Sequence, residues 1–174
     1  AFLDDIAAGQ ALQTTVAALG STSTNAQVKQ ARAAYDALGA LGKAEVTSYA
    51  NLVTVETNLA AAKTDLANAI ATAQTLYNTE KARLDTFTPA EINLINSADN
   101  DSNSAPDNGF TTYQNALNAF KSALDAAKAV DVNADATTTN DIATATTNLN
   151  TALSTFNTAK STFDAIPQVI ATGK

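Results

Sequence analysis

The sequence predicts an all-α protein, organised as two consecutive three-helix bundles that share one long central helix. Apolar residues recur at steps of three and four along most of the 174 residues, which is the spacing of one face of a helix. No segment alternates apolar and polar residues in the manner of a half-buried strand. Threonine is abundant but falls mostly on the polar side of the helical pattern, where that pattern outweighs its β preference.

Two helices are predicted in the N-terminal part of the chain. The first runs from Phe2 to Leu19, is interrupted by Gly9 and is ended by Gly20. A Ser- and Thr-rich linker follows, and its hydroxyl groups are suited to capping the next helix. That second helix is expected from about Asn25 to Leu38, where apolar residues again recur at steps of three and four.

The glycines that follow predict a turn. Gly39 stands just after the last periodic residue, where a helix C-terminus favours a residue that tolerates positive φ. Gly42 then opens a short turn of helix that continues to Val46. No Lys-Ser or Lys-Thr pair follows Gly42 and no strand precedes Gly39, so the pattern of a phosphate-binding loop is not present.

The segment from about residue 51 to 87 has the most regular pattern in the chain. Neither Gly nor Pro interrupts it, which predicts one helix of about 36 residues and about 54 Å. Such a helix is too long for one small globule. We expect it either to serve two bundles in succession, as in spectrin-like arrays, or to project from a single bundle. The first alternative places the domains at residues 1–65 and 66–174. The apolar positions of the long helix include Leu52, Val55, Leu59, Ala62, Leu66, Ala73, Leu84 and Phe87.

The C-terminal half predicts a short helix followed by a helical hairpin. Thr88–Glu91 has the sequence of a capping box with proline at the first helical position. Ser97–Gly109 is polar and rich in turn formers, and is the expected site of proteolysis. Helical spacing then returns over Phe110–Ala127 and Ile142–Ile166, and Pro167 is expected to end the last helix.

Composition points to an extracellular protein. The chain has no Cys, Met, Trp or His, and the absence of easily oxidised side chains suits a protein that stays outside the cell without repair. Its net charge of −7 disfavours nucleic acid or an anionic membrane as partners, because both require clustered Lys and Arg. No apolar run approaches the length of a membrane span. Because the chain starts with Ala-Phe-Leu rather than Met, we expect a mature form or, preferably, an excised fragment.

Catalytic chemistry is not predicted. Catalysis at neutral pH usually recruits His, Cys or a carboxylate with a perturbed pKa, and the first two are absent. A seam of alanine and leucine offers no cleft for a pair of carboxylates, and no second acid is expected opposite those on the long helix. We therefore predict no enzyme, no catalytic residue and no cofactor. The carboxylates that merit inspection are Glu45, Glu56, Glu80 and Glu91.

Calcium is the remaining metal hypothesis, and two loops carry Asp or Asn at the one-three-five spacing of a calcium loop. The first has Ser104 and Phe110 at positions six and twelve, where Gly and Glu are required, and the second has Ala136 and Ile142 there. The favoured alternative is that Asp135, Thr137 and their neighbours cap the last helix. We therefore predict no metal site, and retain as calcium candidates Asp131, Asn133, Asp135, Asp141, Asp99, Asp101 and Asn103.

The four tyrosines allow two interpretations. Tyr35, Tyr49, Tyr77 and Tyr113 would offer stacking surfaces to a sugar or an aromatic partner if they were exposed. Their positions in the helical repeat favour core residues with the hydroxyl group at the surface instead.

Two segments of the chain carry residue patterns that resemble known modules. The first pattern consists of Val28, Ala31, Arg32, Tyr35, Asp36, Ala37, Leu38, Lys43, Ala44, Val46, Thr47, Leu52, Glu56 and Leu59. With this pattern, Val28–Lys63 resembles a repeat of secreted, S-layer and cell-wall proteins of Gram-positive bacteria, with Ala40 and Leu41 in place of the usual polar pair. The second pattern consists of Phe110, Tyr113, Ala116, Leu117, Ala123, Leu124, Ala127, Lys128, Val130, Asp135, Ala136, Thr137, Ile142, Ala145, Leu149 and Leu153. With this pattern, the chain from about Leu66 to Phe156 resembles the FIVAR module.

The resemblance implies a stalk, spacer, wall-association or adhesive unit without catalytic residues. Together with the composition, it leads us to expect a non-enzymatic spacer in an extracellular surface or S-layer protein, whose partners are the neighbouring modules. The alternative is an adhesin or a module that binds a cell-wall polymer or a host glycoprotein. Wall polymers are commonly anionic, and a chain of net charge −7 without a basic cluster is poorly suited to them.

Overall fold

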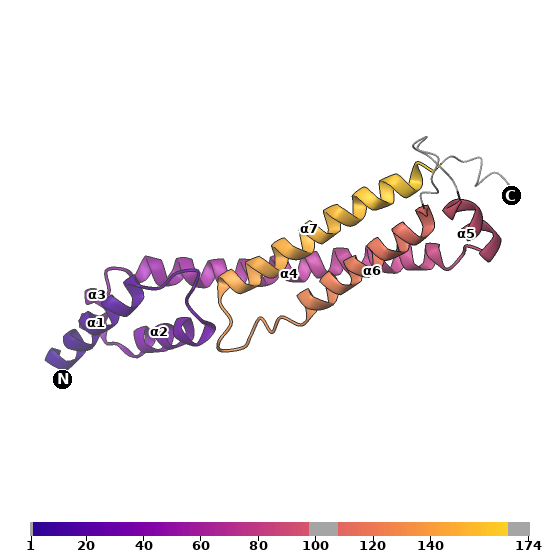
Figure 1. The fold of residues 1–174 in the computed structure, drawn as a ribbon. Helices are drawn as coiled ribbons and strands as arrows, with labels where there is room; N and C mark the ends of the chain where they lie inside the picture. The colour runs from indigo at the N-terminus through magenta and orange to yellow at the C-terminus, as the bar shows by residue number, and fades with distance from the viewer. Residues whose placement is uncertain (1, 98–107, 167–174) are drawn as a thin grey trace. The chain divides into compact units, whose positions relative to one another are not determined.

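The computed structural model describes residues 2–97 and 108–166, and within these ranges the chain is all-helical (Figure 1). No strand occurs among these residues, and the only β-type pairing within them is an isolated bridge between Thr24 and Thr138. The all-α prediction is therefore confirmed. The seven helices are α1 (Phe2–Ala17), α2 (Asn25–Ala37), α3 (Ala40–Glu45), α4 (Tyr49–Leu84), α5 (Pro89–Asn96), α6 (Gly109–Lys128) and α7 (Thr139–Asp164).

The chain divides into two compact units. Unit 1 comprises residues up to Ala67 together with Val130–Ala145, and unit 2 comprises Asn68–Ala129 together with residues from Thr146 onward. This division differs from the sequence-based boundaries of 1–65 and 66–174, because the segment before α7 and the first turns of α7 belong with the N-terminal part. The hydrogen bonds that hold this segment join residues more than a hundred positions apart, which periodicity does not reveal.

Helix α4 has the length that its apolar period predicts. It spans 36 residues from Tyr49 to Leu84, against an expectation of about residues 51 to 87. Its residues up to Ala67 belong to unit 1, and those from Asn68 belong to unit 2. The predicted apolar face is buried, and its buried members are Leu52, Val55, Ala62, Leu66, Ala73 and Leu84.

Capping residues set the starts of two helices as expected. Thr24 caps α2 and forms a capping box with Gln27, so the Ser- and Thr-rich linker has the predicted role. Thr88 caps α5 through a capping box with Glu91, and Pro89 occupies the first turn. Most of the polar loop expected at Ser97–Gly109 lies outside the described residues, and Pro167 lies outside them too.

The turn and short helix predicted around Gly39 and Gly42 are confirmed, because α2 ends at Ala37 and α3 runs from Ala40 to Glu45. The details predicted for three glycines are wrong. Gly9 does not interrupt α1 but lies buried within it. Gly39 has φ −73° and is the N-cap of α3, while Gly42 lies inside that helix, and no described glycine has positive φ. Small size is what these positions require: a Cβ atom on Gly9 would lie 2.2 Å from the carbonyl oxygen of Gly42. The glycines let α1 and α3 pack backbone against backbone.

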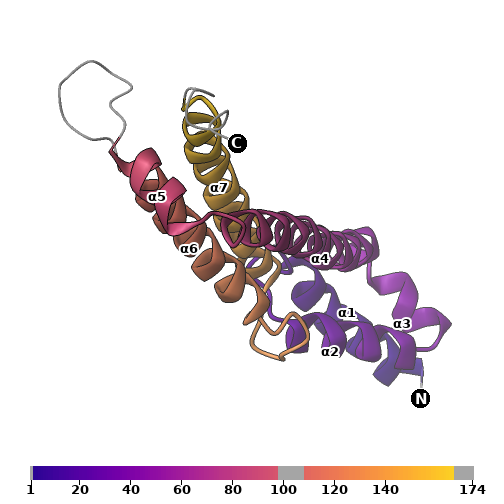
Figure 2. The ribbon, with the colours of Figure 1, turned by 90° about the vertical axis from the view of Figure 1, so that its right-hand side faces the viewer.

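Each unit has its own core. In unit 1, aliphatic side chains of α1, α2 and α4 pack together with Val46, and Tyr35 and Leu38 cover the cluster at its edge. In unit 2, aromatic rings from α6 and α7 stack on one another, and Phe87, which follows α4, joins them edge to face. Helix α5 packs on α6 in this unit (Figure 2).

Candidate functional site

The most distinctive polar group of unit 2 is Glu80, because its position on α4 is almost fully buried. Only 4% of the residue is exposed, and Oε2 accepts a hydrogen bond of 2.6 Å from the hydroxyl group of Tyr113 on α6. Two cations lie beside the same carboxylate: Arg83 at 3.4 Å and Lys160 of α7 at 3.7 Å. Burial of an acid is tolerated here because it is hydrogen-bonded and paired.

The same two cations also bind Asp164. Arg83 Nη2 lies 2.5 Å from Asp164 Oδ1, and Lys160 Nζ lies 2.5 Å from Asp164 Oδ2. Glu80, Arg83, Tyr113, Lys160 and Asp164, which we call the Glu80 network, therefore join α4, α6 and α7 through two carboxylates and two cations. The guanidinium of Arg83 also lies over the rings of Tyr113 and Phe163, a favourable cation–π arrangement.

The electrostatics of the Glu80 network favour fixed protonation states. Burial raises the pKa of the Tyr113 hydroxyl, and its hydrogen bond to Glu80 raises this pKa further. Burial opposes the charge of Asp164, but hydrogen bonds from Lys160 and Arg83 outweigh it and lower its pKa. Burial likewise opposes the charge of Arg83, yet its pKa is raised because Asp164 and Glu80 accept hydrogen bonds from it. Tyr113 therefore stays neutral, and Arg83 and Asp164 stay charged, over the physiological range.

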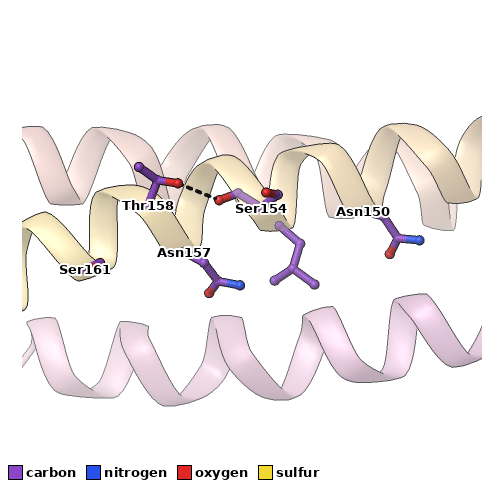
Figure 3. Close-up of a pocket in the computed structure, with 6 residues that line it drawn as sticks. Asn150, Ser154, Asn157, Thr158 and Ser161 are labelled. Atoms are coloured by element: carbon purple, nitrogen blue, oxygen red, sulfur yellow. Dashed lines mark hydrogen bonds between the residues drawn. The ribbon is translucent and has the colours of Figure 1, made fainter.

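The Glu80 network holds three helices of unit 2 together and lies apart from the two surface depressions described next. A surface depression of about 630 Å³ occurs on α7, but its lining comes from that one helix and includes no member of the Glu80 network. Figure 3 shows Asn150, Ser154, Asn157, Thr158 and Ser161 along it, with Thr158 donating to the carbonyl oxygen of Ser154. A second depression, on α4, is lined by alanine, threonine and leucine.

The other three carboxylates that the sequence analysis singled out accept hydrogen bonds from protein side chains or backbone groups. Glu45 accepts a hydrogen bond from Gln10, and Glu91 completes the capping box of α5 with Thr88. Glu56 binds the guanidinium of Arg32 through both of its oxygens. These contacts position helices, and each uses the carboxylate as a hydrogen-bond acceptor.

The calcium candidates of the second loop make contacts with protein groups instead of converging. Asp131 accepts from the backbone N–H of Asn133, whose own side-chain oxygen accepts from Lys63 at 3.1 Å. Asp135 pairs with Lys29 at 3.2 Å. Asp141 accepts from the backbone N–H and the hydroxyl group of Thr138 at the start of α7, and these bonds lower its pKa.

The expected capping of α7 falls to a neighbour of Asp135 and Thr137. Thr138 and Asp141 bond reciprocally at the start of this helix. Thr137 instead donates its hydroxyl group to the carbonyl oxygen of Asp131. Asp99, Asp101 and Asn103 lie outside the described residues. Among the residues that are described, no three His, Cys, Asp or Glu side chains gather as metal ligands would.

The tyrosines divide between core and surface. Tyr113 is buried with 1% exposed, and it stacks on Phe156 and Phe163. Tyr49 is 36% exposed and stacks on Tyr35 with ring centroids 4.3 Å apart. Arg32 lies over both of these rings, and its bonds to Glu56 and Tyr49 raise its pKa.

Sequence reasoning singled out Glu80 but missed its partners. Glu80 and Arg83 are three residues apart, and Lys160 and Asp164 are four apart, so each pair was detectable as a helical ion pair. The pairing of α4 with α7 was not detectable from spacing alone. Asn25, which is buried with 1% exposed, gave no signal because its partners lie far along the chain.

Comparisons with known proteins add no family. No protein-family model, curated protein or solved structure matches the chain. No helix within the described ranges is both long and apolar enough to cross a membrane. The functional interpretation therefore depends on the residues themselves.

Proposed function

We propose that the chain is a non-enzymatic structural module of a bacterial extracellular surface or S-layer protein, and that it holds or spaces neighbouring domains. In this proposal each unit is a three-helix bundle, and α4 is the helix that the two bundles share. The resemblance to FIVAR and related surface repeats and the absence of the easily oxidised residues Cys, Met, Trp and His support it.

The observation that carries the proposal is the continuity of α4. This helix contributes Leu52 and Val55 to the core of unit 1, and it contributes Glu80 and Leu84 to the buried part of unit 2. Its 36 residues contain neither Gly nor Pro. A sharp bend would have to break successive i to i−4 hydrogen bonds, so a shared helix of this kind resists bending between modules.

A distance measurement tests this mechanical role. The chain contains no cysteine, so Gln30→Cys and Asn118→Cys, at exposed positions of units 1 and 2, give two unique attachment sites for spin labels or fluorophores. We expect a narrow distribution of label distances. The control replaces two neighbouring residues of α4 by glycine, Ala67→Gly with Asn68→Gly, because glycine in a helix costs about 1 kcal/mol relative to alanine. It should broaden the distribution, whereas a broad distribution in the parent chain would contradict the spacer proposal.

The second candidate function is adhesion to a wall polymer or a glycoprotein, and one observation favours it. The stacked pair of Tyr35 and Tyr49 leaves Tyr49 partly exposed, beside the cation of Arg32. Exposed aromatic rings with adjacent polar groups are suited to recognising sugars. The net charge of −7 disfavours anionic polymers and favours a neutral or cationic surface.

Pull-down on purified wall and matrix fractions separates the two functions. A spacer should retain nothing from either fraction. An adhesin that uses the Tyr35–Tyr49 pair should retain material, and Tyr49→Ala should lose it. Tyr77→Ala is the matched control, since Tyr77 is a half-buried tyrosine of the same helix in unit 2.

A further inference from the structure

Residues 130–137, which lie between α6 and α7, are bound to the start of α2 by a dense set of hydrogen bonds. The side-chain amide of Asn25 donates to the carbonyl oxygens of Val132 and Ala134, at 3.0 and 2.8 Å. The backbone N–H groups of Asn25 and Ala26 donate to Thr137 and Asp135, at 2.9 and 3.1 Å. Four carbonyl groups of this segment are thus satisfied by two consecutive residues of α2.

From these contacts we propose that residues 130–137 form a strap that opens and closes as a unit over the start of α2, with Asn25 as its latch. Asn25 is the central contact because its side chain and backbone together make three of the four bonds to these carbonyl groups. The other side-chain hydrogen bonds that join the strap to neighbouring helices, from Lys29 to Asp135 and from Lys63 to Asn133, are exposed. Exposed pairs contribute little, so release of Asn25 releases the strap.

Both neighbouring helices keep their own caps when the strap opens. Helix α2 starts with the capping box of Thr24 and Gln27, and α7 starts with the reciprocal bonds of Thr138 and Asp141. Neither cap uses a strap carbonyl group. Opening therefore costs the strap contacts without unwinding either helix, which is the condition for a separable local transition.

The closed strap also carries an internal cost. Asn25 Oδ1 is buried and has no hydrogen-bond partner among the described residues, and a buried acceptor without a partner opposes folding. Opening would hydrate this oxygen as well as the strap carbonyl groups. The free energies of the closed and open forms therefore differ by less than the number of hydrogen bonds suggests.

Amide hydrogen exchange of the full chain tests the strap. In the parent protein, the amides of Ala26, Ala134 and Thr137, all of which donate to carbonyl groups of the strap, should exchange together. They should exchange faster than the amides of α6 in unit 2. Asn25→Ala should accelerate the three amides by a common factor and leave α6 unchanged. The control Lys29→Ala removes only an exposed contact of the strap and should leave all rates near those of the parent.

Other outcomes would overturn the proposal. Unchanged exchange of the three amides in Asn25→Ala would show that Asn25 is not the latch. Equal acceleration in the strap and throughout unit 1, including Val28 of α2, would show general unfolding of the unit instead of a strap. If Asn25→Ala does not fold, Asn25→Ser is the substitute variant, because it retains one hydroxyl donor. It should produce a smaller acceleration of exchange that is confined to the same three amides. Acceleration across unit 1 in this variant would also refute the strap.

Discussion

Gly9 of α1 and Gly42 of α3 meet backbone to backbone. A Cβ atom built on Gly9 would lie 2.2 Å from the carbonyl oxygen of Gly42 and 2.8 Å from its Cα atom. The same approach lets Asp5 of α1 accept hydrogen bonds from the backbone N–H groups of Gly39 and Gly42, both at 2.8 Å. The carboxylate of one helix thereby caps the start of another, whose own N-cap has no side chain.

Gly9→Ala should destabilise the protein because the added methyl group has no room. Its nearest contact is backbone, which cannot rotate away, so α1 and α3 must separate. Overpacking of this kind costs about 1 to 3 kcal/mol, and the loss should appear as a lower denaturation midpoint in urea.

Gly20→Ala is the matched control for that experiment. A Cβ atom on Gly20 would meet nothing within 4 Å, and the residue has no positive φ. The substitution should leave the free energy of unfolding unchanged or raise it by about 0.4 to 1 kcal/mol, because alanine has fewer unfolded conformations. A loss at Gly20 as large as that at Gly9 would contradict the steric explanation.

The helices themselves were predictable because each has enough apolar residues at helical spacing to identify its face. The length of α4 followed from the uninterrupted pattern between Leu52 and Leu84, and the cap of α5 followed from Thr88 and Glu91. These features depend on residues that are close in the sequence, where spacing and capping rules apply directly.

What sequence reasoning missed depends on contacts between distant residues. Gly9 reads as a helix breaker unless its neighbour Gly42 is known. Asn25 reads as an ordinary first-turn residue, although its partners lie 107 and 109 positions away. For the same reason Glu80 was recognised as a carboxylate of interest without the Tyr113 hydroxyl that binds it.

Tyr113→Phe should lower the stability of unit 2 although it removes only one oxygen atom. It leaves the buried carboxylate of Glu80 without its shortest hydrogen bond, of 2.6 Å. Hydrogen bonds to charged groups contribute about 1.5 to 3 kcal/mol, so the free energy of unfolding should fall by that amount in chemical denaturation.

Tyr77→Phe provides the comparison for Tyr113→Phe. Tyr77 is half-buried, and its ring contacts Lys121. Removal of its hydroxyl group should change stability by no more than about 0.5 kcal/mol. The assigned role of the Glu80 network is wrong if the two substitutions have equal effects.

Acid should weaken the ion pairs of Asp164. Burial opposes its charge, but hydrogen bonds from Lys160 and Arg83 lower its pKa below the ordinary value of 3.8. A group whose pKa is lower in the folded state contributes stability above its unfolded pKa, and that contribution is lost as the pH falls through the folded pKa. The free energy of unfolding should therefore decrease below about pH 4.

Asp164→Asn isolates this contribution. The variant should be less stable than the parent at pH 7, and the difference should shrink as the pH falls below 4, because both chains then lack the charge. Denaturation midpoints at a series of pH values would measure it. The control Asp135→Asn removes an exposed pair with Lys29 and should give a smaller loss of stability at pH 7. A loss of stability in Asp164→Asn that stays constant at every pH would exclude the ion-pair explanation.

Calcium should not stabilise the described loop between α6 and α7. A hard cation requires several oxygen ligands that face one point, but Asn133 and Asp135 are directed to Lys63 and Lys29. A ligand that binds only the folded state raises the thermal midpoint in proportion to its occupancy. Midpoints with excess calcium and with EDTA should therefore agree in a variant in which Asp99, Asp101 and Asn103 are replaced by alanine, so that only the described loop is tested. A higher midpoint with calcium in that variant, abolished by Asp131→Ala, would show that the lysine contacts give way to a metal ion.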